Sequence, residues 1–221
     1  MSLAAPSRVA TPPLLTSCPH EAINTITHLV GLILALAAAP VLLAKAAEHG
    51  PWQVAIASVY LVTMCGTYLA STLSHAFAQP DLQRLFRMAD QGMIFLFIAG
   101  TCTPVLLGCL PLWVSGPLMT AVWAVALAGF VGKVALGHRI YGISVTLYLV
   151  LGWLPILARP AILYYMPLGC TALVIGGGVI YTIGTYFLMS DRREYYYHAI
   201  WHVLVLTAGA VHFAAIYYYA V

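Results

Sequence analysis

The sequence predicts an all-α integral membrane protein built as a seven-transmembrane helix bundle. The first observation is composition, because 62% of the 221 residues are hydrophobic, only 7% are charged, and the mean hydropathy is +0.94. The second is the length of the apolar stretches, since an α-helix needs about 20 mainly apolar residues to cross a bilayer. Seven such stretches follow one another, over residues 22–44, 52–77, 90–110, 112–133, 140–158, 161–189 and 197–220. Few residues remain for a soluble domain.

The chain begins with a segment that is not typical of a transmembrane helix. The first 20 residues include four prolines and no apolar run, which predicts a disordered cytoplasmic tail over residues 1–20 rather than a signal peptide. A seven-helix transmembrane domain then covers residues 21–221. The first helix ends near Lys45, and the sequence at residues 49–51 predicts the turn that follows it.

Short polar or turn-forming segments separate the second, third and fourth helices. The second helix ends near His75, and the polar stretch 79–87 predicts a short interfacial helix before the third. Only residues 108–111 separate the third helix from the fourth, so these two are antiparallel neighbours. Residues 137–139 then turn the chain back.

The last three helices differ in length. The fifth is short and ends at Arg159 and Pro160, whereas the sixth stretch is too long for one simple span and carries Gly176–Gly178 near its middle. A glycine triplet in a membrane helix indicates a close helix contact or a kink. Tyr195–Tyr197 and Tyr217–Tyr219 flank the seventh helix, as interfacial aromatic belts do.

The distribution of basic residues predicts the orientation. Lys45 and Arg159 lie on one side of the predicted topology, and the other basic residues lie on the side of the N-terminus. The latter are Arg8, Arg84, Arg87, Lys133, Arg139, Arg192 and Arg193. The positive-inside rule then places the N-terminus in the cytoplasm and the C-terminus outside, in a multi-pass protein of the plasma (inner) membrane. The basic residues form no patch of the kind that binds nucleic acid. The cysteines form no Cys-X-X-Cys pair, so we predict no disulfide framework.

Three histidines are predicted to meet at one depth of the membrane. His198 and His202 are four residues apart, so they project from one face of the seventh helix. His75 ends the second helix on the same side of the predicted bilayer. Polar side chains in lipid are costly and usually functional. Three imidazoles favour Zn²⁺, leave a fourth position for water, and allow the metal to lower the pKa of that water to about 7.

Several other polar residues belong to the same end of the bundle. Asp90 opens the third helix and could orient or deprotonate the water, and Ser71 lies on the face of His75, one turn deeper, so we predict both as catalytic residues. His28, Glu21 and Asn24 are predicted to brace the site from outside the metal ligands.

Simpler explanations stay open for these residues. Each histidine could pack or cap a helix end, a zinc ion could only pin the second and seventh helices together, and Asp90 could pair with Arg87 at a helix N-terminus. His212 lies ten residues beyond His202, about 15 Å along the helix, so it cannot share that metal and is expected to make a separate polar contact.

Taken together, these residues resemble the hemolysin III family. The resemblance rests on Glu21, Asn24, Thr27, His28 and Gly31, on Ser71 to His75, on Asp90, and on the segment from His198 to His202. That family belongs with the progestin and adipoQ receptors (PAQR), whose members hold zinc through three histidines. Because the wider superfamily includes alkaline ceramidases, the resemblance implies hydrolysis of a lipid amide, with membrane lipids, a ceramide-like or fatty-acyl substrate, as partners.

Three functions remain in competition. The first is a zinc-dependent, ceramidase-like hydrolase with a role in membrane homeostasis. The second is a non-enzymatic membrane sensor or homeostasis factor in which zinc is structural. The third is a hemolysin-like pore former, although the sequence has no polar stripe that would line a channel.

Overall fold

The computed structural model describes residues 13–137, 141–191, 193, 194 and 196–221, and it confirms the seven-helix prediction. Six spans are single helices, and the fifth is made of two helices joined by a short 3₁₀ segment. The helices are α1 (Pro19–Ala47), α2 (Pro51–Ala76), α3 (Pro80–Cys109), α4 (Leu112–Leu136), α5 (Tyr141–Trp153), α6 (Arg159–Tyr165), α7 (Leu168–Met189) and α8 (Tyr197–Tyr219). All seven spans are long and apolar enough to cross a membrane, so this is a multi-pass integral membrane protein.

The boundary between the fifth and sixth spans was predicted wrongly. The fifth span runs over Ser144–Tyr165, through α5, the 3₁₀ segment Leu154–Ala158 and α6. Pro160 lies in the first turn of α6, where a proline is well tolerated because its missing N–H has no helical partner to lose. The turn lies at Met166 and Pro167 instead, so α7 has the length of an ordinary span.

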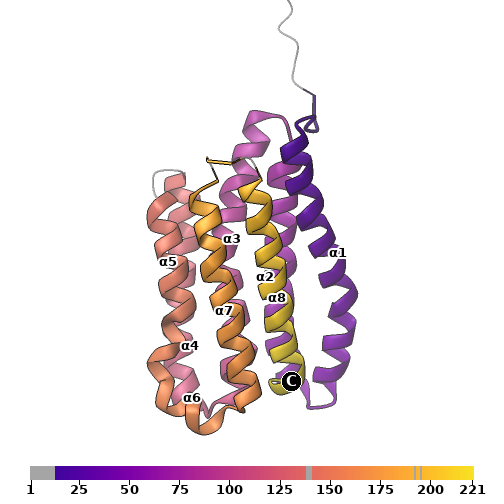
Figure 1. The fold of residues 1–221 in the computed structure, drawn as a ribbon. Coiled ribbons are helices and arrows are strands. Elements are labelled where there is room, and N and C mark those ends of the chain that lie inside the picture. The colour runs from indigo at the N-terminus through magenta and orange to yellow at the C-terminus, as the bar shows by residue number, and fades with distance from the viewer. Residues whose placement is uncertain (1–12, 138–140, 192, 195) are drawn as a thin grey trace, which may run out of the picture.

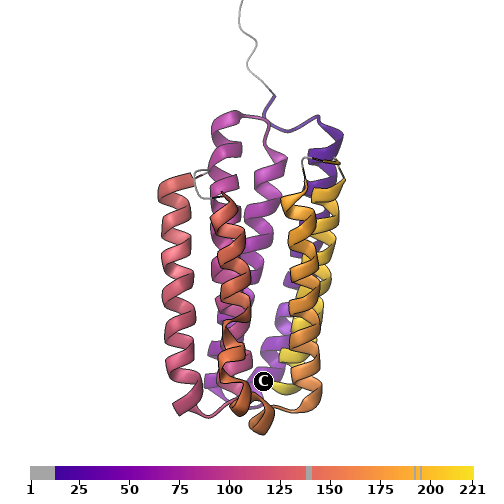
Figure 2. The ribbon, with the colours of Figure 1, turned by 60° about the vertical axis from the view of Figure 1, so that its left-hand side comes forward.

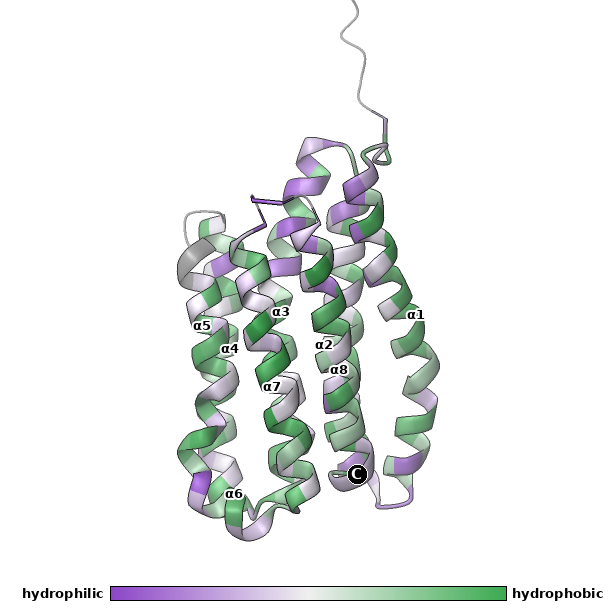
Figure 3. Ribbon diagram, in the orientation of Figure 1, coloured by the Kyte–Doolittle hydropathy of each residue, from purple (hydrophilic) through white to green (hydrophobic). Residues whose placement is uncertain are grey.

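The polar stretch 79–87 is helical from Pro80 onward, but it is not a separate interfacial helix. It forms the first turns of α3, which is 30 residues long and therefore extends past the hydrocarbon layer at one end. Hydrophilic residues gather at this end of the bundle, where α1 and α3 begin (Figure 3).

The helices form one bundle with a common long axis (Figures 1 and 2). Neighbours in sequence pack side by side in the pairs α1–α2, α2–α3, α3–α4 and α7–α8, and α8 also contacts α1 and α3, which brings the end of the chain against its start. Tyr60, Phe95 and Ile216 are fully buried between helices, whereas Leu34 and Val62 are exposed on outer faces. Such outer faces are suited to lipid.

Glycines allow the close approach of α7 and α8. A Cβ on Gly177 would overlap the His212 imidazole, and one on Gly184 would overlap the Trp201 ring. Because α7 continues as one helix through the glycine triplet, close contact with α8, and not a kink, explains Gly177. Gly176 faces open space.

Some predictions concern residues outside the described part of the chain. They include most of the tail 1–20, the positions of Arg8, Arg139, Arg192 and Tyr195, and part of the turn 137–139. Within the described part, the chain before α1 pairs with the end of α2, since the Thr16 N–H donates to the Ala76 carbonyl over 2.8 Å and the Ala78 N–H donates to the Leu14 carbonyl over 3.0 Å. The cytoplasmic location of the N-terminus stays a prediction.

Candidate metal centre

Three histidines from two helices meet at the end of the bundle where α8 begins. His75 lies in the last turn of α2, and His198 and His202 lie in the first two turns of α8. One ring nitrogen from each lies within 4.8 Å of the others, and the ring centroids are 4.6 to 5.1 Å apart. The three residues that the sequence predicts as metal ligands are thus close enough to hold one metal ion.

The contact of His75 with Glu21 fixes the proton on its ring. The Nδ1 atom of His75 lies 2.5 Å from Oε2 of Glu21, and a carboxylate can only accept, so Nδ1 carries the hydrogen. The Nε2 atom then presents a lone pair, 3.2 Å from Nε2 of His198. Arg87 donates to the other oxygen of Glu21 over 2.9 Å and holds the carboxylate in place.

A threonine has the same effect on His202, which is 1% exposed. The Thr27 hydroxyl donates its hydrogen to the Asn24 carbonyl over 2.8 Å. Its oxygen therefore accepts from Nδ1 of His202, 3.0 Å away. The Nε2 atom of His202 is left with a lone pair, as on His75.

The third histidine also has an acceptor on its Nδ1 side, because Oδ2 of Asp191 lies 3.6 Å from Nδ1 of His198. An acceptor beside each Nδ1 is the arrangement that orients metal-ligating imidazoles. Tetrahedral zinc with Zn–N bonds of about 2.0–2.1 Å separates its ligand nitrogens by about 3.3 Å. The 3.2 Å between His75 and His198 fits that spacing, and the donor set fits a divalent transition metal.

Asp90 and Ser71 lie beside the histidines. The Ser74 hydroxyl donates to the Asp90 carboxylate, with 3.4 Å between Oγ of Ser74 and Oδ2 of Asp90, and Asp90 interacts electrostatically with His75 and His198. Arg87, which the sequence offered as a partner for Asp90, forms its salt bridge with Glu21. In the described part of the chain, Asp90 is therefore bonded to Ser74, the residue before His75.

His28 contacts the cluster by ring packing. It is 3% exposed, its ring centroid lies 3.8 Å from that of His202, and the Tyr68 ring meets it edge to face at 5.5 Å. Among the described residues, neither of its ring nitrogens has a hydrogen-bond partner. Packing, and not a hydrogen bond, is thus how His28 supports His202.

Sequence reasoning missed three residues that position the ligands: Thr27, Arg87 and Asp191. Thr27 stood within the motif at the start of the first helix, but its use as an acceptor depends on α8 lying against α1. Asp191 lies in the segment before α8, where no local pattern marks it.

A model of the family described as Haemolysin-III related matches residues 16–213. The chain belongs to the haemolysin III family. Hemolysin-3 of Bacillus cereus is 34% identical over 201 residues, 90% of this chain and 91% of that protein. The Hemolysin-3 homolog of Bacillus subtilis is 34% identical over 203 residues, with 91% and 95% covered. The human monocyte to macrophage differentiation factor is 29% identical over 216 residues, with 92% and 85% covered, so the relatives extend to the PAQR proteins.

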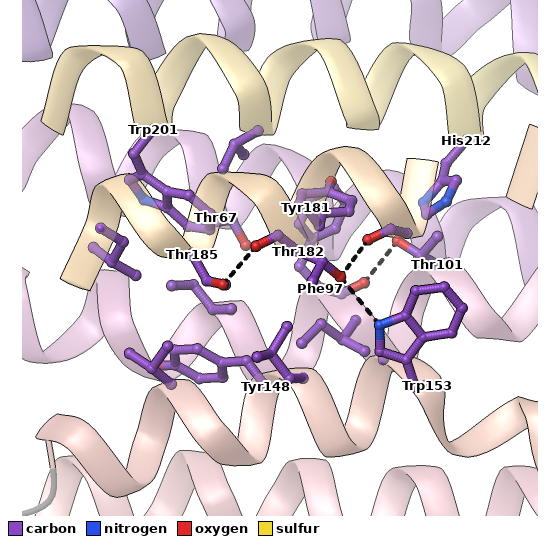
Figure 4. Close-up of a pocket in the computed structure, with 18 of the residues that line it drawn as sticks. Thr67, Phe97, Thr101, Tyr148, Trp153, Tyr181, Thr182, Thr185, Trp201 and His212 are labelled. Carbon is purple, nitrogen blue, oxygen red and sulfur yellow. Dashed lines mark hydrogen bonds between the residues drawn. The ribbon is translucent and has the colours of Figure 1, made fainter. Parts of the chain in front are cut away.

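This haemolysin III protein has a cavity that begins at His75 and His198. Its volume is about 940 Å³, and its lining residues run from Glu21 and His75 at one end to Met166 at the turn before α7. Between them the walls are mainly apolar and aromatic, with Phe97, Tyr148 and side chains from α7 and α8 (Figure 4). A long apolar molecule with one polar end fits this shape and lining.

Proposed function

We propose that this haemolysin III protein is a Zn²⁺-dependent hydrolase of the plasma membrane that cleaves a lipid amide, with a ceramide-like or fatty-acyl substrate, and so contributes to membrane homeostasis. The observation that carries the proposal is the set of three oriented imidazoles, beside a carboxylate, at one end of a lipid-sized cavity. His75, His198 and His202 would hold the metal.

The proton-handling residue is Asp90. When bound, zinc polarises the amide carbonyl and makes its water acidic enough to act near neutral pH. Asp90 would accept a proton from the attacking water and return it to the amide nitrogen as the C–N bond breaks, so that the amide and water yield a carboxylic acid and an amine. Ala199 follows His198 directly, where zinc proteases with two spaced histidines carry a glutamate base, so this role falls to Asp90.

The surrounding residues keep the site oriented. Glu21 and Thr27 bond Nδ1 of His75 and His202, and Asp191 lies 3.6 Å from Nδ1 of His198. The Ser74 hydroxyl donates to the carboxylate of Asp90. The apolar cavity receives the acyl chain and excludes water from it. The lipid enters from the bilayer, whose hydrocarbon contains the same chains.

Replacement of Asp90 by Asn tests the proposal. The Asp90→Asn protein is expected to keep about one zinc per chain and to lose the hydrolysis of ceramide-like amides by a factor of about 10² or more. Asp81→Asn is the matched control, since Asp81 is an exposed carboxylate in the first turn of the same helix. Zinc content is measured by plasma mass spectrometry and product by lipid mass spectrometry. Wild-type protein that holds zinc and releases no fatty acid from any amide would instead point to a structural metal.

A further inference from the structure

The cavity contains a second group of polar side chains, near the middle of the bundle. His212 on α8 and Tyr181 on α7 line it, with ring centroids 5.6 Å apart. Trp153 and Thr182 lie close by, joined by a hydrogen bond of 3.1 Å from Nε1 to Oγ1 (Figure 4). The Trp153 and Thr182 groups are therefore paired with each other.

His212 and Tyr181 each present an unpaired polar atom. The Nε2 atom of His212 lies 3.0 Å from the Val174 carbonyl, which can only accept, so Nε2 carries the hydrogen and Nδ1 is an acceptor. Over the described residues, neither Nδ1 of His212 nor the Tyr181 hydroxyl has a hydrogen-bond partner, and both atoms are buried. His212 is 8% exposed. An unmade hydrogen bond in such a place is costly, so both groups are suited to a ligand.

The placement of His212 depends on Gly177. Gly177 leaves the space that the His212 imidazole fills, since a Cβ there would overlap the ring. Gly177 and Tyr181 are four residues apart, on one face of α7. The same face of one helix thus makes room for the acceptor and supplies the donor.

We propose that His212 and Tyr181 form a binding subsite for a hydroxyl group on a fatty-acyl chain. A hydroxyl can donate to Nδ1 of His212 while it accepts from the Tyr181 O–H, which satisfies both unpaired groups at once. The inference rests on the proposed function in taking an acyl lipid as the occupant of the cavity. It narrows the substrate class to acyl chains that are hydroxylated at a defined position.

The position of the hydroxyl on the acyl chain follows from the distance along α8 between His202 and His212. His212 lies ten residues beyond His202, about 15 Å along the helix axis. An extended alkyl chain with C–C bonds of about 1.52 Å advances about 1.25 Å per carbon. About 12 C–C bonds therefore span this distance, so with the carboxyl carbon at the histidine cluster a hydroxyl at His212 is carried by about C12 or C13.

Binding of fatty acids to the full-length protein in detergent micelles tests the subsite. The ligands are 12-hydroxyoctadecanoic acid, octadecanoic acid and 3-hydroxyoctadecanoic acid, each measured by displacement of a fluorescent fatty acid. Wild-type protein is expected to prefer the 12-hydroxy acid over both others by about tenfold. Tyr181→Phe is expected to reduce that preference to about twofold. Tyr186→Phe is the matched control, since Tyr186 lies on the same helix, is 55% exposed and lies outside the cavity lining, and it should keep the full preference.

Several outcomes would overturn the subsite: equal affinity for the three acids, a preference that survives in Tyr181→Phe, or no displacement by any of them. Equal affinity is the result expected if water already forms the hydrogen bonds of His212 and Tyr181. Equal binding together with amide hydrolysis that depends on Asp90 would reject the subsite alone. Preference for the 12-hydroxy acid without hydrolysis of any amide would support the subsite and reject the hydrolase.

Discussion

Replacement of Glu21 by Gln is expected to weaken zinc binding by about tenfold. The Glu21 carboxylate accepts the Nδ1 hydrogen of His75, with 2.5 Å between the two atoms, and it is held by Arg87. A hydrogen bond to a charged group contributes about 1.5–3 kcal/mol and a neutral one about 0.5–1.5 kcal/mol. The difference, about 1–1.5 kcal/mol, corresponds to about a tenfold change in Kd, which agrees with the roughly 10–100-fold effects of residues that orient metal ligands.

The assay is competition for zinc between the protein and a chelating dye of known affinity. Glu48→Gln is the control, because Glu48 is an exposed carboxylate at the other end of α1, 3.7 Å from Lys45. The fold is monitored by the melting temperature in the absence of zinc. If Glu21→Gln and Glu48→Gln both bound zinc as tightly as the wild type, the orientation of His75 by Glu21 would have no part in metal affinity.

Three further predictions use the same protein preparations. Thr27→Val should weaken zinc binding by several-fold to about tenfold, because His202 loses the acceptor for its Nδ1 hydrogen. Thr25→Val is the control, since the Thr25 hydroxyl bonds to the Glu21 carbonyl of its own helix. Equal Kd values for the two variants would refute this prediction. Gly177→Ala should lower the free energy of unfolding by about 1–3 kcal/mol, because the added methyl group would overlap the His212 ring. Gly176→Ala should not lower it, since the space beside Gly176 is open. An unchanged melting temperature in Gly177→Ala would contradict the packing of α7 on α8. Removal of zinc by a chelator should lower the melting temperature, since zinc at 100 times its Kd stabilises the folded state by about 2.7 kcal/mol; identical thermograms with and without chelator would argue against a site in the folded protein.

The sequence was sufficient for the number of spans and for the meeting of the three histidines. Both depend on depth in the bilayer, which apolar length and chain direction determine. His75 at the end of one span and His198 at the start of another on the same side had to lie at one level. No local pattern shows that α2 and α8, which carry these histidines, come close to each other. They do so because both helices pack against α1 and α3.

The break in the fifth span could not be predicted because Pro160 has two opposite uses. A proline ends a helix when it falls in the interior, but it is favoured in the first turn. In this chain a short 3₁₀ segment precedes it, so that α6 starts just before Pro160 and the span continues. Local sequence does not distinguish these two cases.

The pairings that orient the ligands could not be predicted for another reason. Glu21 and His75 are 54 residues apart, and Thr27 and His202 are 175 apart. Arg87 lay close to Asp90 in sequence and was an equally good partner on local grounds, yet it pairs with Glu21 of α1. Such pairings depend on which helices are in contact. The shape and lining of the cavity depend on the same contacts.

The measurement that tests the metal site most directly is the zinc content of purified wild-type protein and of His202→Ala, by plasma mass spectrometry. His212→Asn is the control for loss of a buried histidine on the same helix, and size-exclusion chromatography establishes that each protein is folded and monodisperse. We predict about one zinc per chain in the wild type and in His212→Asn, and loss of zinc in His202→Ala. Wild-type protein without zinc after exposure to the metal, or full zinc content in His202→Ala, would contradict a site formed by His75, His198 and His202.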